Sequence, residues 1–287
     1  MTAADTTSDA PSSGRPHKVS EPEKGTRLSA VEIHDNILAG ASEDVARPAA
    51  SLFWSALASG LVIGMSFIAS AFLTTLATTD PMKRMLVAAG YPLGFVFVVL
   101  GRSELFTENT LEPVLPLLHE RTMQRLRELG RLWALLLAGN MVGALVFGVL
   151  LARTPIVPDS MHEAMRSVAE LGTSGGFGTV FYRGIFAGWL IALMAWLMGS
   201  TTARGAQMVI IWICSAAISA FGFRHSIAGS VEAFYRASAG TASWGGMVFD
   251  FIVPAVLGNA VGGVVLVALL NYAQVKAELP DGAHTEE

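Results

Sequence analysis

The sequence predicts an all-α integral membrane protein with six transmembrane helices in two inverted three-helix repeats, the second and fifth helices being broken. Three observations support this fold class. The 287 residues are 52% hydrophobic and only 15% charged, which lies outside the range of ordinary soluble domains. The third and sixth apolar segments have closely similar sequences, and charged residues interrupt the second and the fifth.

Long apolar segments with few charges locate the helices, because a transmembrane helix needs about 20 predominantly apolar residues. The expected spans are 50–78, 85–118 (broken), 132–152, 178–200, 206–235 (broken) and 247–272. The first has no charged side chain and is rich in glycine, alanine and serine. Such small residues let membrane helices approach closely, so this span is expected to be a packing helix.

An internal repeat relates the third and sixth spans. Residues 139–151 read GNMVGALVFGVLL and residues 258–270 read GNAVGGVVLVALL, and the two align without gaps. A repeat unit with an odd number of spans forces its second copy into the inverted orientation. Glycine-rich apolar helices can also match by chance. A duplication makes a separate prediction, namely that the fifth span is broken as the second is.

Both breaks are visible in the sequence. Residues 101–113 read GRSELFTENTLEP within the second span, and residues 221–232 read FGFRHSIAGSVE within the fifth. Charge and non-helical backbone are tolerated at membrane depth only where protein or a water-filled cavity covers them. We therefore expect two broken helices facing a pathway. For the first segment, the alternative is a short helix followed by a polar surface loop.

The remaining segments set the domain boundaries. Residues 1–27 are polar and poor in large apolar side chains, which predicts a disordered cytoplasmic tail. Apolar residues at helical spacing among acidic ones predict an amphipathic surface helix at 28–47, ended by Pro48. The transmembrane domain is expected at 48–275, followed by a cytoplasmic C-terminal tail at 276–287.

Basic residues predict the orientation in the membrane. The positive-inside rule places in the cytoplasm a cluster that follows the first broken span, Arg121, Arg125, Arg127 and Arg131. Both termini are then cytoplasmic, because two spans precede the cluster and six cross in total. The opposite side would carry basic residues as well, which argues against this orientation: Lys83, Arg84, Arg153 and Arg166.

Several kinds of site lack sequence support. The six histidines never occur at metal-ligand spacing and Cys214 is the only cysteine, so we expect no metal and no intramolecular disulfide. No phosphate-binding glycine loop or nucleophile elbow is present, and no cofactor is expected. The net charge of −4 gives no footprint for nucleic-acid binding. Residues 1–27 contain no apolar signal-peptide core.

Thr107 and His225 are the polar residues best placed to face each other if the two breaks meet near the bilayer centre. Free N–H groups at the ends of half-helices favour an anion there. Histidine can exchange protons near neutral pH, and a threonine hydroxyl can donate to an anion or orient the ring. The alternative for His225 is a structural histidine bonded to a loop carbonyl.

The other ionisable residues of the breaks form either a charge network that braces the loops or part of the pathway. They are Arg102, Glu104, Glu108, Arg224 and Glu232. For the arginines and Glu104, bracing is at least as well supported as a place in the pathway.

These motifs resemble those of the formate/nitrite transporter family. The resemblance rests on G-x-S-E-L-F-T at 101–107, G-N-x-V-G-A at 139–144, G-F-x-H-S-I-A at 222–228 and the duplicated spans, and it covers about residues 28 to 275. It implies a homopentamer of aquaporin-like protomers in the bacterial cytoplasmic (inner) membrane. Each protomer would have its own pore for small monovalent anions of weak acids.

The resemblance also implies roles for individual residues. One loop would gate the pore from within, and it consists of Leu105, Phe106 and Thr107. His225 would be the central histidine. Tyr91 and Phe95 would line the cytoplasmic constriction, and Ile191 and Ile218 would stand at apolar positions of the other constriction.

Four positions depart from the family pattern. Arg224 stands where an acidic residue is common, Gly188 where asparagine is usual, Gly172 where lysine is expected, and Gly229 where asparagine is frequent. We expect these changes to enlarge one side of the pore and to alter its charge. They leave the substrate open rather than the fold.

The first functional hypothesis is a passive or proton-coupled channel for a small anion such as formate, nitrite or hydrosulfide, with Thr107 and His225 at its centre. Its partners would be that anion, membrane lipid and further copies of the chain. A pore for a cation or neutral solute, for example ammonium, is the alternative if Glu104, Glu108 and Glu232 line the path. A membrane enzyme lacks a nucleophile or metal beside His225. A non-conducting protein remains open, since Phe106, Tyr91 and Phe95 could plug the pore.

Overall fold

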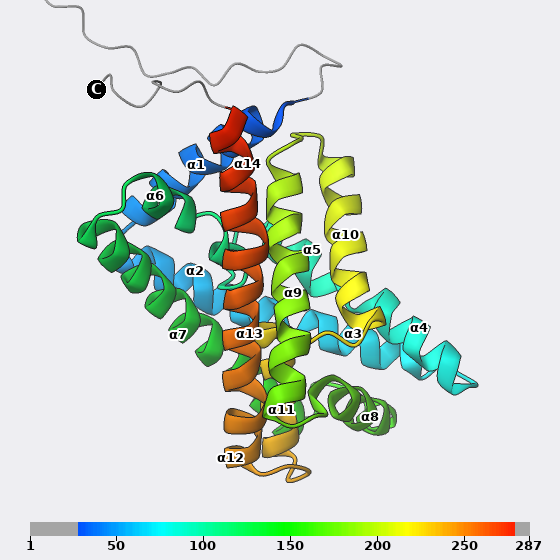
Figure 1. Cartoon of the computed structure of the whole chain (residues 1–287). Coiled ribbons are helices and arrows are strands. Elements are labelled where there is room, and N and C mark those ends of the chain that lie inside the picture. Colours follow the sequence, from blue (N-terminus) through cyan, green and yellow to red (C-terminus); the bar gives the residue numbers. More distant parts are fainter. Residues whose placement is uncertain (1–27, 279–287) are drawn as a thin grey trace, which may run out of the picture.

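A computed structural model describes residues 28–278, and within this range every regular element is a helix (Figure 1). The expected N-terminal tail at 1–27 lies outside the described residues. So does the expected C-terminal tail from residue 279 onward. Residues 276–278, which the sequence assigned to that tail, still belong to the last helix.

The described helices follow one another along the chain without a strand. They are α1 (Ala30–Ala46), α2 (Ala49–Val62), α3 (Met65–Thr74), α4 (Asp80–Gly90), α5 (Pro92–Leu100), η1 (Glu108–Thr110), α6 (Val114–His119), α7 (Met123–Arg153), η2 (Asp159–Met161), α8 (His162–Thr173), α9 (Phe177–Met198), α10 (Arg204–Ala220), α11 (Ser226–Ser238), α12 (Trp244–Gly246), η3 (Met247–Ile252), α13 (Val253–Gly263), η4 (Val264–Leu269) and α14 (Leu270–Glu278). Of these, η3 and η4 are π-helical segments.

Five helical stretches of the described chain are long and apolar enough to cross a membrane, so the chain is a multi-pass membrane protein. They are Ala49–Thr74, Asp80–Leu100, Met123–Arg153, Phe177–Met198 and Trp244–Glu278. The expected fifth span differs. Its first half, α10, has 17 residues and ends at the break. Nearly every residue of its second half, α11, is buried.

Local sequence explains where α1 begins and ends. Ser29 and Glu32 form a capping box, in which the Ser29 hydroxyl accepts from the Glu32 N–H and the Glu32 carboxylate accepts from the Ser29 N–H. The Ser29 N–H and hydroxyl, which both donate to the Glu32 carboxylate, lower the pKa of Glu32. The helix ends at Ala46, and Arg47 is extended because Pro48 follows it.

Two helix pairs pack at very short distance and build the frame of the molecule. In the pair of α2 and α7, a Cβ added to Gly60 or Gly143 would collide with the backbone of the partner helix. In the pair of α9 and α13, a Cβ on Gly188 or Gly262 would do the same. Such contacts need glycine, because any side chain would force the two backbones apart.

One helix, α8, was not expected from the sequence, and it packs against α3 and α11. Its buried side chains recur at helical spacing, at Met165, Val168 and Ala169. Figure 1 shows α8 and α12 at one end of the molecule, and α1, α6 and the end of α14 at the other. We call these ends the α8 side and the α1 side.

Candidate functional site

The first break begins where α5 ends in a Schellman motif. The Ser103 N–H donates to the Val98 carbonyl at 3.0 Å, and the Arg102 N–H donates to the Val99 carbonyl at 3.1 Å. This motif needs a residue in the left-handed conformation, and Arg102 adopts it with φ of 54°. Only a few per cent of non-glycine residues have positive φ, so the chain is held in this turn by its surroundings.

The second break begins in the same way at the end of α10. The Phe223 N–H donates to the Ile218 carbonyl at 2.9 Å, and the Gly222 N–H donates to the Ser219 carbonyl at 3.1 Å. Gly222 is the left-handed residue here, with φ of 68°. The two breaks therefore leave their helices through one backbone motif, with Gly222 in the position of Arg102.

Two buried asparagines hold the breaks. The Asn140 amide donates to the carbonyls of Ala56 and Glu104, at 2.7 and 2.9 Å, and its oxygen accepts from the Phe106 N–H at 2.8 Å. The Asn259 amide has the corresponding partners. It donates to the carbonyls of Gly184 and Arg224, at 2.9 and 2.8 Å, and accepts from the Ser226 N–H at 2.8 Å.

These contacts assign equivalent positions in the two breaks. The carbonyls of Glu104 and Arg224 accept the same bond, and the N–H groups of Phe106 and Ser226 donate the same bond. The residue between them is Leu105 in the first break and His225 in the second. Equivalent backbone positions thus carry chemically different side chains.

Thr107 and His225 lie side by side between the breaks. The Thr107 Oγ1 is 2.8 Å from the His225 Nε2, and both residues are buried. The His225 Nδ1 accepts from the Ala228 N–H at 3.2 Å and so caps α11. Because Nδ1 is an acceptor, the neutral ring carries its proton on Nε2 and donates it to Thr107 Oγ1. The Thr107 hydroxyl then keeps its own proton free for another acceptor.

Apolar side chains surround this pair. The rings of Phe95 and His225 pack edge to face with their centroids 4.9 Å apart, and the ring centroids of Tyr91 and Phe95 are 5.3 Å apart. The other apolar residues singled out in the sequence belong to the same buried cluster, namely Leu105, Phe106, Ile191 and Ile218. A hydrated ion cannot cross such apolar surroundings without losing its water, which costs free energy.

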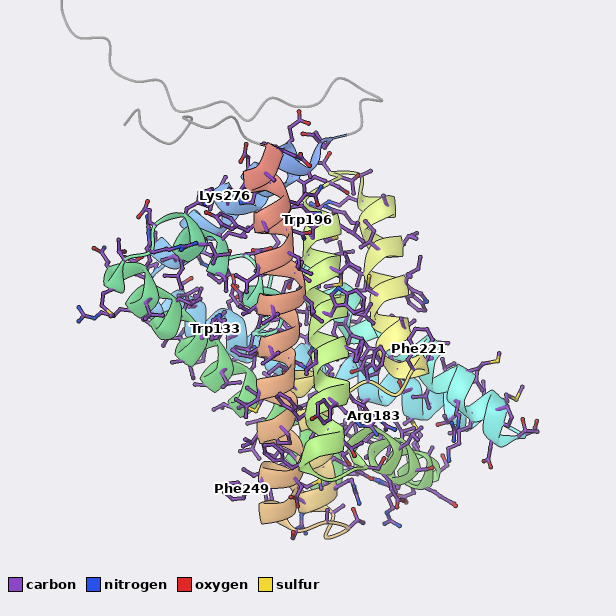
Figure 2. All side chains as sticks on the ribbon, viewed as in Figure 1. Trp133, Arg183, Trp196, Phe221, Phe249 and Lys276 are labelled. Atoms are coloured by element: carbon purple, nitrogen blue, oxygen red, sulfur yellow. The ribbon has the colours of Figure 1, made fainter. Side chains whose placement is uncertain are left out.

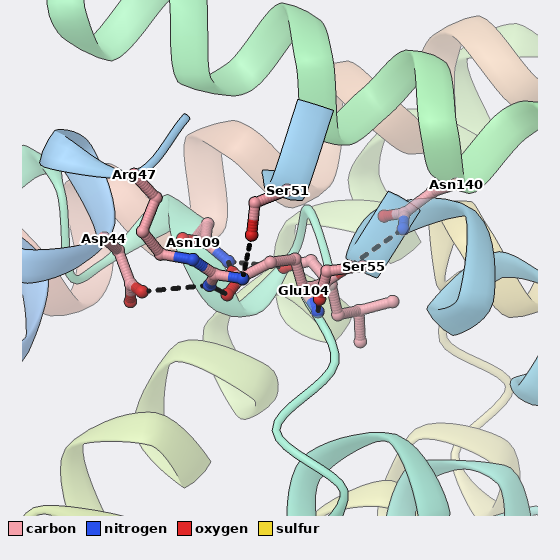
Figure 3. Close-up of polar contacts among 8 residues, drawn as sticks. Asp44, Arg47, Ser51, Ser55, Glu104, Asn109 and Asn140 are labelled. Carbon is pink, nitrogen blue, oxygen red and sulfur yellow. Dashed lines mark hydrogen bonds and ion pairs between the residues drawn. The ribbon is translucent and has the colours of Figure 1, made fainter. Parts of the chain in front are cut away.

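A cavity of about 470 Å³ opens on the α1 side of the pair. One wall is α1, and another is the first break. Figure 3 shows Arg47 paired with both Asp44 and Glu104, while the Asn109 amide donates to Glu104 at 3.0 Å. The Glu104 N–H donates to the Ser55 hydroxyl at 3.0 Å. These contacts join Glu104 of the first break to the end of α1.

A second cavity, of about 280 Å³, opens on the α8 side. Tyr91, Arg224 and Glu232 line it, as do Arg183 and Phe221, which are labelled in Figure 2. Thr107 and His225 line neither of the two cavities. Glu108, which follows Thr107, lines the α1-side cavity, and Arg224, which precedes His225, lines the α8-side cavity, so the pair lies between them.

The charged residues named from the sequence therefore fall into two groups. Arg102, Glu104 and Glu108 line the cavity on the α1 side, and Arg224 and Glu232 line the cavity on the α8 side. Sequence reasoning missed Arg47, the partner of Glu104, since the two lie 57 residues apart and only the fold brings them together.

Tyr91 lines the cavity away from α1, so a cytoplasmic constriction at Tyr91 and a cytoplasmic N-terminal helix cannot both hold. The expectation for Gly188 needs correction. Gly188 does not enlarge the pore, because a Cβ there would collide with the backbone of Asn259 in the contact with α13. Gly172 and Gly229, by contrast, do line the α8-side cavity.

Comparisons with known proteins agree on one family. The chain is 31% identical over 257 residues to the inner membrane protein YfdC of Escherichia coli, covering 90% of this chain and 82% of that protein. It is 30% identical over 248 residues to the nitrite transporter NirC of Salmonella typhimurium, covering 79% of this chain and 85% of that protein.

A solved pentameric formate channel with formate bound has the same fold. It superimposes with a TM-score of 0.68 at 22% identity, covering 79% of this chain and 97% of that chain. The family model described as formate/nitrite transporter matches residues 31–273. The chain therefore belongs to the formate/nitrite transporter family.

Proposed function

We propose that the chain forms a transmembrane channel or transporter for small monovalent anions of weak acids, with formate and nitrite as the first candidates. The observation that carries this proposal is the Thr107–His225 pair, 2.8 Å apart, enclosed by apolar side chains and flanked by a cavity on each side. Family membership supports the transport of such anions, since relatives are named formate and nitrite transporters.

The pair acts on the anion by hydrogen bonding. The His225 Nε2–H donates to the Thr107 oxygen and so orients the hydroxyl, whose own proton can be donated to a passing anion. An anion that has lost its water gains this donor at the point where the surroundings are most apolar. Passage is passive, or coupled to a proton when the anion crosses as its neutral acid.

The apolar side chains on both sides of the pair act as constrictions. Leu105, Phe106 and Thr107 form the loop that gates the pore, and Tyr91 and Phe95 close the α8 side. Ile191 and Ile218 complete the apolar lining. A hydrated cation is rejected because these side chains offer nothing in place of its water.

The architecture we propose is an inverted repeat of two three-helix units, assembled as a homopentamer. The matching partners of Asn140 and Asn259 support the repeat, because one side chain performs the same three-bond task at each break. The pentamer is supported by the solved formate channel, which is pentameric. Crosslinking or mass photometry of the detergent-purified protein tests it.

We place both termini in the cytoplasm. The first turns of α7 carry Arg125, Arg127 and Arg131, and Arg131 donates to the carbonyl of Arg47 at the end of α1, so these arginines lie on the α1 side, which fits the positive-inside rule. Reporter fusions at either terminus test this orientation. Residues 1–27 would then form a cytoplasmic tail, and α1 a surface helix at the cytoplasmic mouth.

The test of function is uptake of labelled formate, nitrite, hydrosulfide and ammonium into liposomes holding the purified protein, with and without an inward proton gradient. We expect anion uptake that the gradient increases and that His225→Ala abolishes. Uptake that is indifferent to His225 would contradict the mechanism. A matched control is His162→Ala, a partly buried histidine at the start of α8 that lines neither cavity.

A cation pore is the second candidate, and one observation favours it. The α1-side cavity is lined by four acidic residues, Asp44, Glu104, Glu108 and Glu112. Ammonium uptake exceeding formate uptake in the same liposomes would select this function. No uptake of any solute would leave a non-conducting protein, with Phe106, Tyr91 and Phe95 as the plug.

A further inference from the structure

The two cavities differ in the charges that line them. On the α8 side the charged lining consists of Arg84, Arg183, Arg224 and Glu232, so basic groups outnumber acidic ones. On the α1 side the acidic groups outnumber the basic ones, with Asp44, Glu104, Glu108 and Glu112 against Arg47, Arg102 and Arg204. An anion that enters from the α8 side therefore meets the favourable field.

Arg224 is the most constrained of these basic groups. Its side chain is 4% exposed, and its Nη2 donates to the carbonyl and hydroxyl of Ser174 at 3.0 and 3.1 Å. Its Nε is buried without a hydrogen-bond partner, and among residues 28–278 it makes no ion pair. A buried guanidinium with an unused N–H and no carboxylate in direct contact is costly unless something else supplies the acceptor.

The equivalent residue of the first break shows what a satisfied charge looks like here. Glu104, which the asparagine contacts place opposite Arg224 in the repeat, is paired with Arg47 and accepts from Asn109. Both residues are buried to a similar degree. The fold thus neutralises the charge at one break from within the chain and leaves it open at the other.

Glu232 is the acidic residue that lines the same cavity as Arg224. It lies on α11, is 4% exposed, and has room only because residue 172 is glycine: a Cβ on Gly172 would collide with its carboxylate. No bond within ion-pair distance joins Glu232 to Arg224 in the described chain. A diffusible anion can therefore bind the Arg224 guanidinium, which no carboxylate of the described chain contacts.

We propose that the α8-side cavity is a binding site for planar oxyanions, carboxylates and nitrite, with Arg224 as the residue that selects them. A guanidinium is a planar fork that matches two oxygens of one anion, whereas a spherical anion such as chloride gains only its charge. The volume of about 280 Å³ holds a small carboxylate and several waters. This inference rests on the proposed function and names the anion class that the pore receives.

The site lies directly before the Thr107–His225 pair. Arg224 is adjacent to His225 in the chain, and the ring of Tyr91, which lines the cavity, packs on Phe95 against His225. The rings of Tyr91 and Phe95 therefore separate an anion released by Arg224 from the pair. When its carboxyl is ionised, Glu232 opposes the bound anion by like charge and so favours its release.

The test is anion binding to the purified protein, measured as the rise in melting temperature with sodium formate, sodium nitrite or sodium chloride at constant ionic strength. We expect formate and nitrite to stabilise the wild type at concentrations about tenfold lower than chloride. Arg224→Lys keeps the charge but not the fork, and should bring formate and chloride to equal effect. Glu232→Gln should tighten formate binding several-fold, and Arg204→Gln, in the other cavity, should leave it unchanged.

Equal stabilisation of the wild type by formate and chloride would overturn the proposal, even if no variant folds. A preference for formate that survives in Arg224→Lys would overturn the role of Arg224. Liposome flux separates this inference from the proposed function. Flux that depends on His225 while Arg224→Lys keeps the wild-type KM removes the site alone, and oxyanion binding without flux removes the function alone.

Discussion

The two breaks share a backbone frame and differ in the path of the chain beyond it. Each leaves its helix through a Schellman motif and is fixed by two hydrogen bonds to one asparagine, whose third hydrogen bond goes to a neighbouring helix. The second then enters α11, a helix of 13 residues buried almost throughout. The first enters η1 and the six-residue α6, separated by a turn with Pro113. Only the frame, therefore, is repeated.

The side chains on this frame differ more than the backbone does. Leu105 occupies the position of His225, and Glu104 the position of Arg224. Because the frame is the same, these substitutions contribute directly to the different chemistry of the two sides. One backbone frame can therefore carry two different sites, and variants at both breaks test how far the breaks are equivalent.

The largest effect is expected from removing either asparagine. Asn140→Ala and Asn259→Ala each leave two buried backbone groups of a break without a partner and remove a third hydrogen bond, to a carbonyl inside a helix, so each should destabilise the protein by about 3 kcal/mol. Thermal unfolding of the purified protein measures this. Asn36→Ala, which loses one 3.4 Å hydrogen bond, is the control. A marked difference between the two losses would break the equivalence of the halves.

The next effect concerns the charges at equivalent positions. Arg47→Gln leaves the carboxylate of Glu104 without its cation and should cost about 2 kcal/mol, allowing for the 30% exposure of the Arg47 side chain. The double variant Arg47→Gln/Glu104→Gln should regain most of this loss. Arg224→Gln removes no ion pair and should cost about 1 kcal/mol or less. The same unfolding experiment compares all three, and equal costs would contradict the contrast between a paired and an open charge.

A functional effect of about tenfold is expected at Thr107. Thr107→Val keeps the shape but removes the hydroxyl, which leaves the His225 Nε2–H unused and takes away the donor to the anion. Formate flux in liposomes should fall by this factor and return in Thr107→Ser. Ser103→Ala, in the same loop, serves as the control. Full flux in the valine variant would remove the hydroxyl from the mechanism.

The smallest effect compares the two left-handed residues. Arg102→Gly should stabilise the protein by about 0.5 kcal/mol, because glycine adopts positive φ without the steric cost that arginine has there. Gly222→Ala should destabilise it by about 1 kcal/mol for the opposite reason. Melting temperatures give both signs. Shifts of the same sign would mean that side-chain contacts, rather than backbone conformation, dominate at these positions.

Much of the fold and part of the site could be predicted from the sequence. Helix breaks show as charge inside apolar segments, and the shared GN of the third and sixth spans marks Asn140 and Asn259 as a repeated pair. The role of that pair was not visible, since its partners lie on other helices. The helix α8 was not predicted because it is short and carries charged residues, so it lacks the long apolar pattern that marks the spans.

Other features depend on which way a side chain points, and sequence does not give this. Gly188 could have faced the pore or the neighbouring helix, and its contact with Asn259 decides for the helix. The same holds for the side on which Tyr91 lies. Pairing of Arg47 with Glu104 joins α1 to the first break and requires the tertiary fold.

The cap that His225 places on α11 links acid–base chemistry to the start of a helix. The neutral ring already has its proton on Nε2, so a second proton must enter at Nδ1, where the Ala228 N–H is bound. Charging the ring and opening the first turn of α11 are then one event. The exchange rate of the Ala228 amide proton would report how often this histidine becomes a cation, without any measurement of transport.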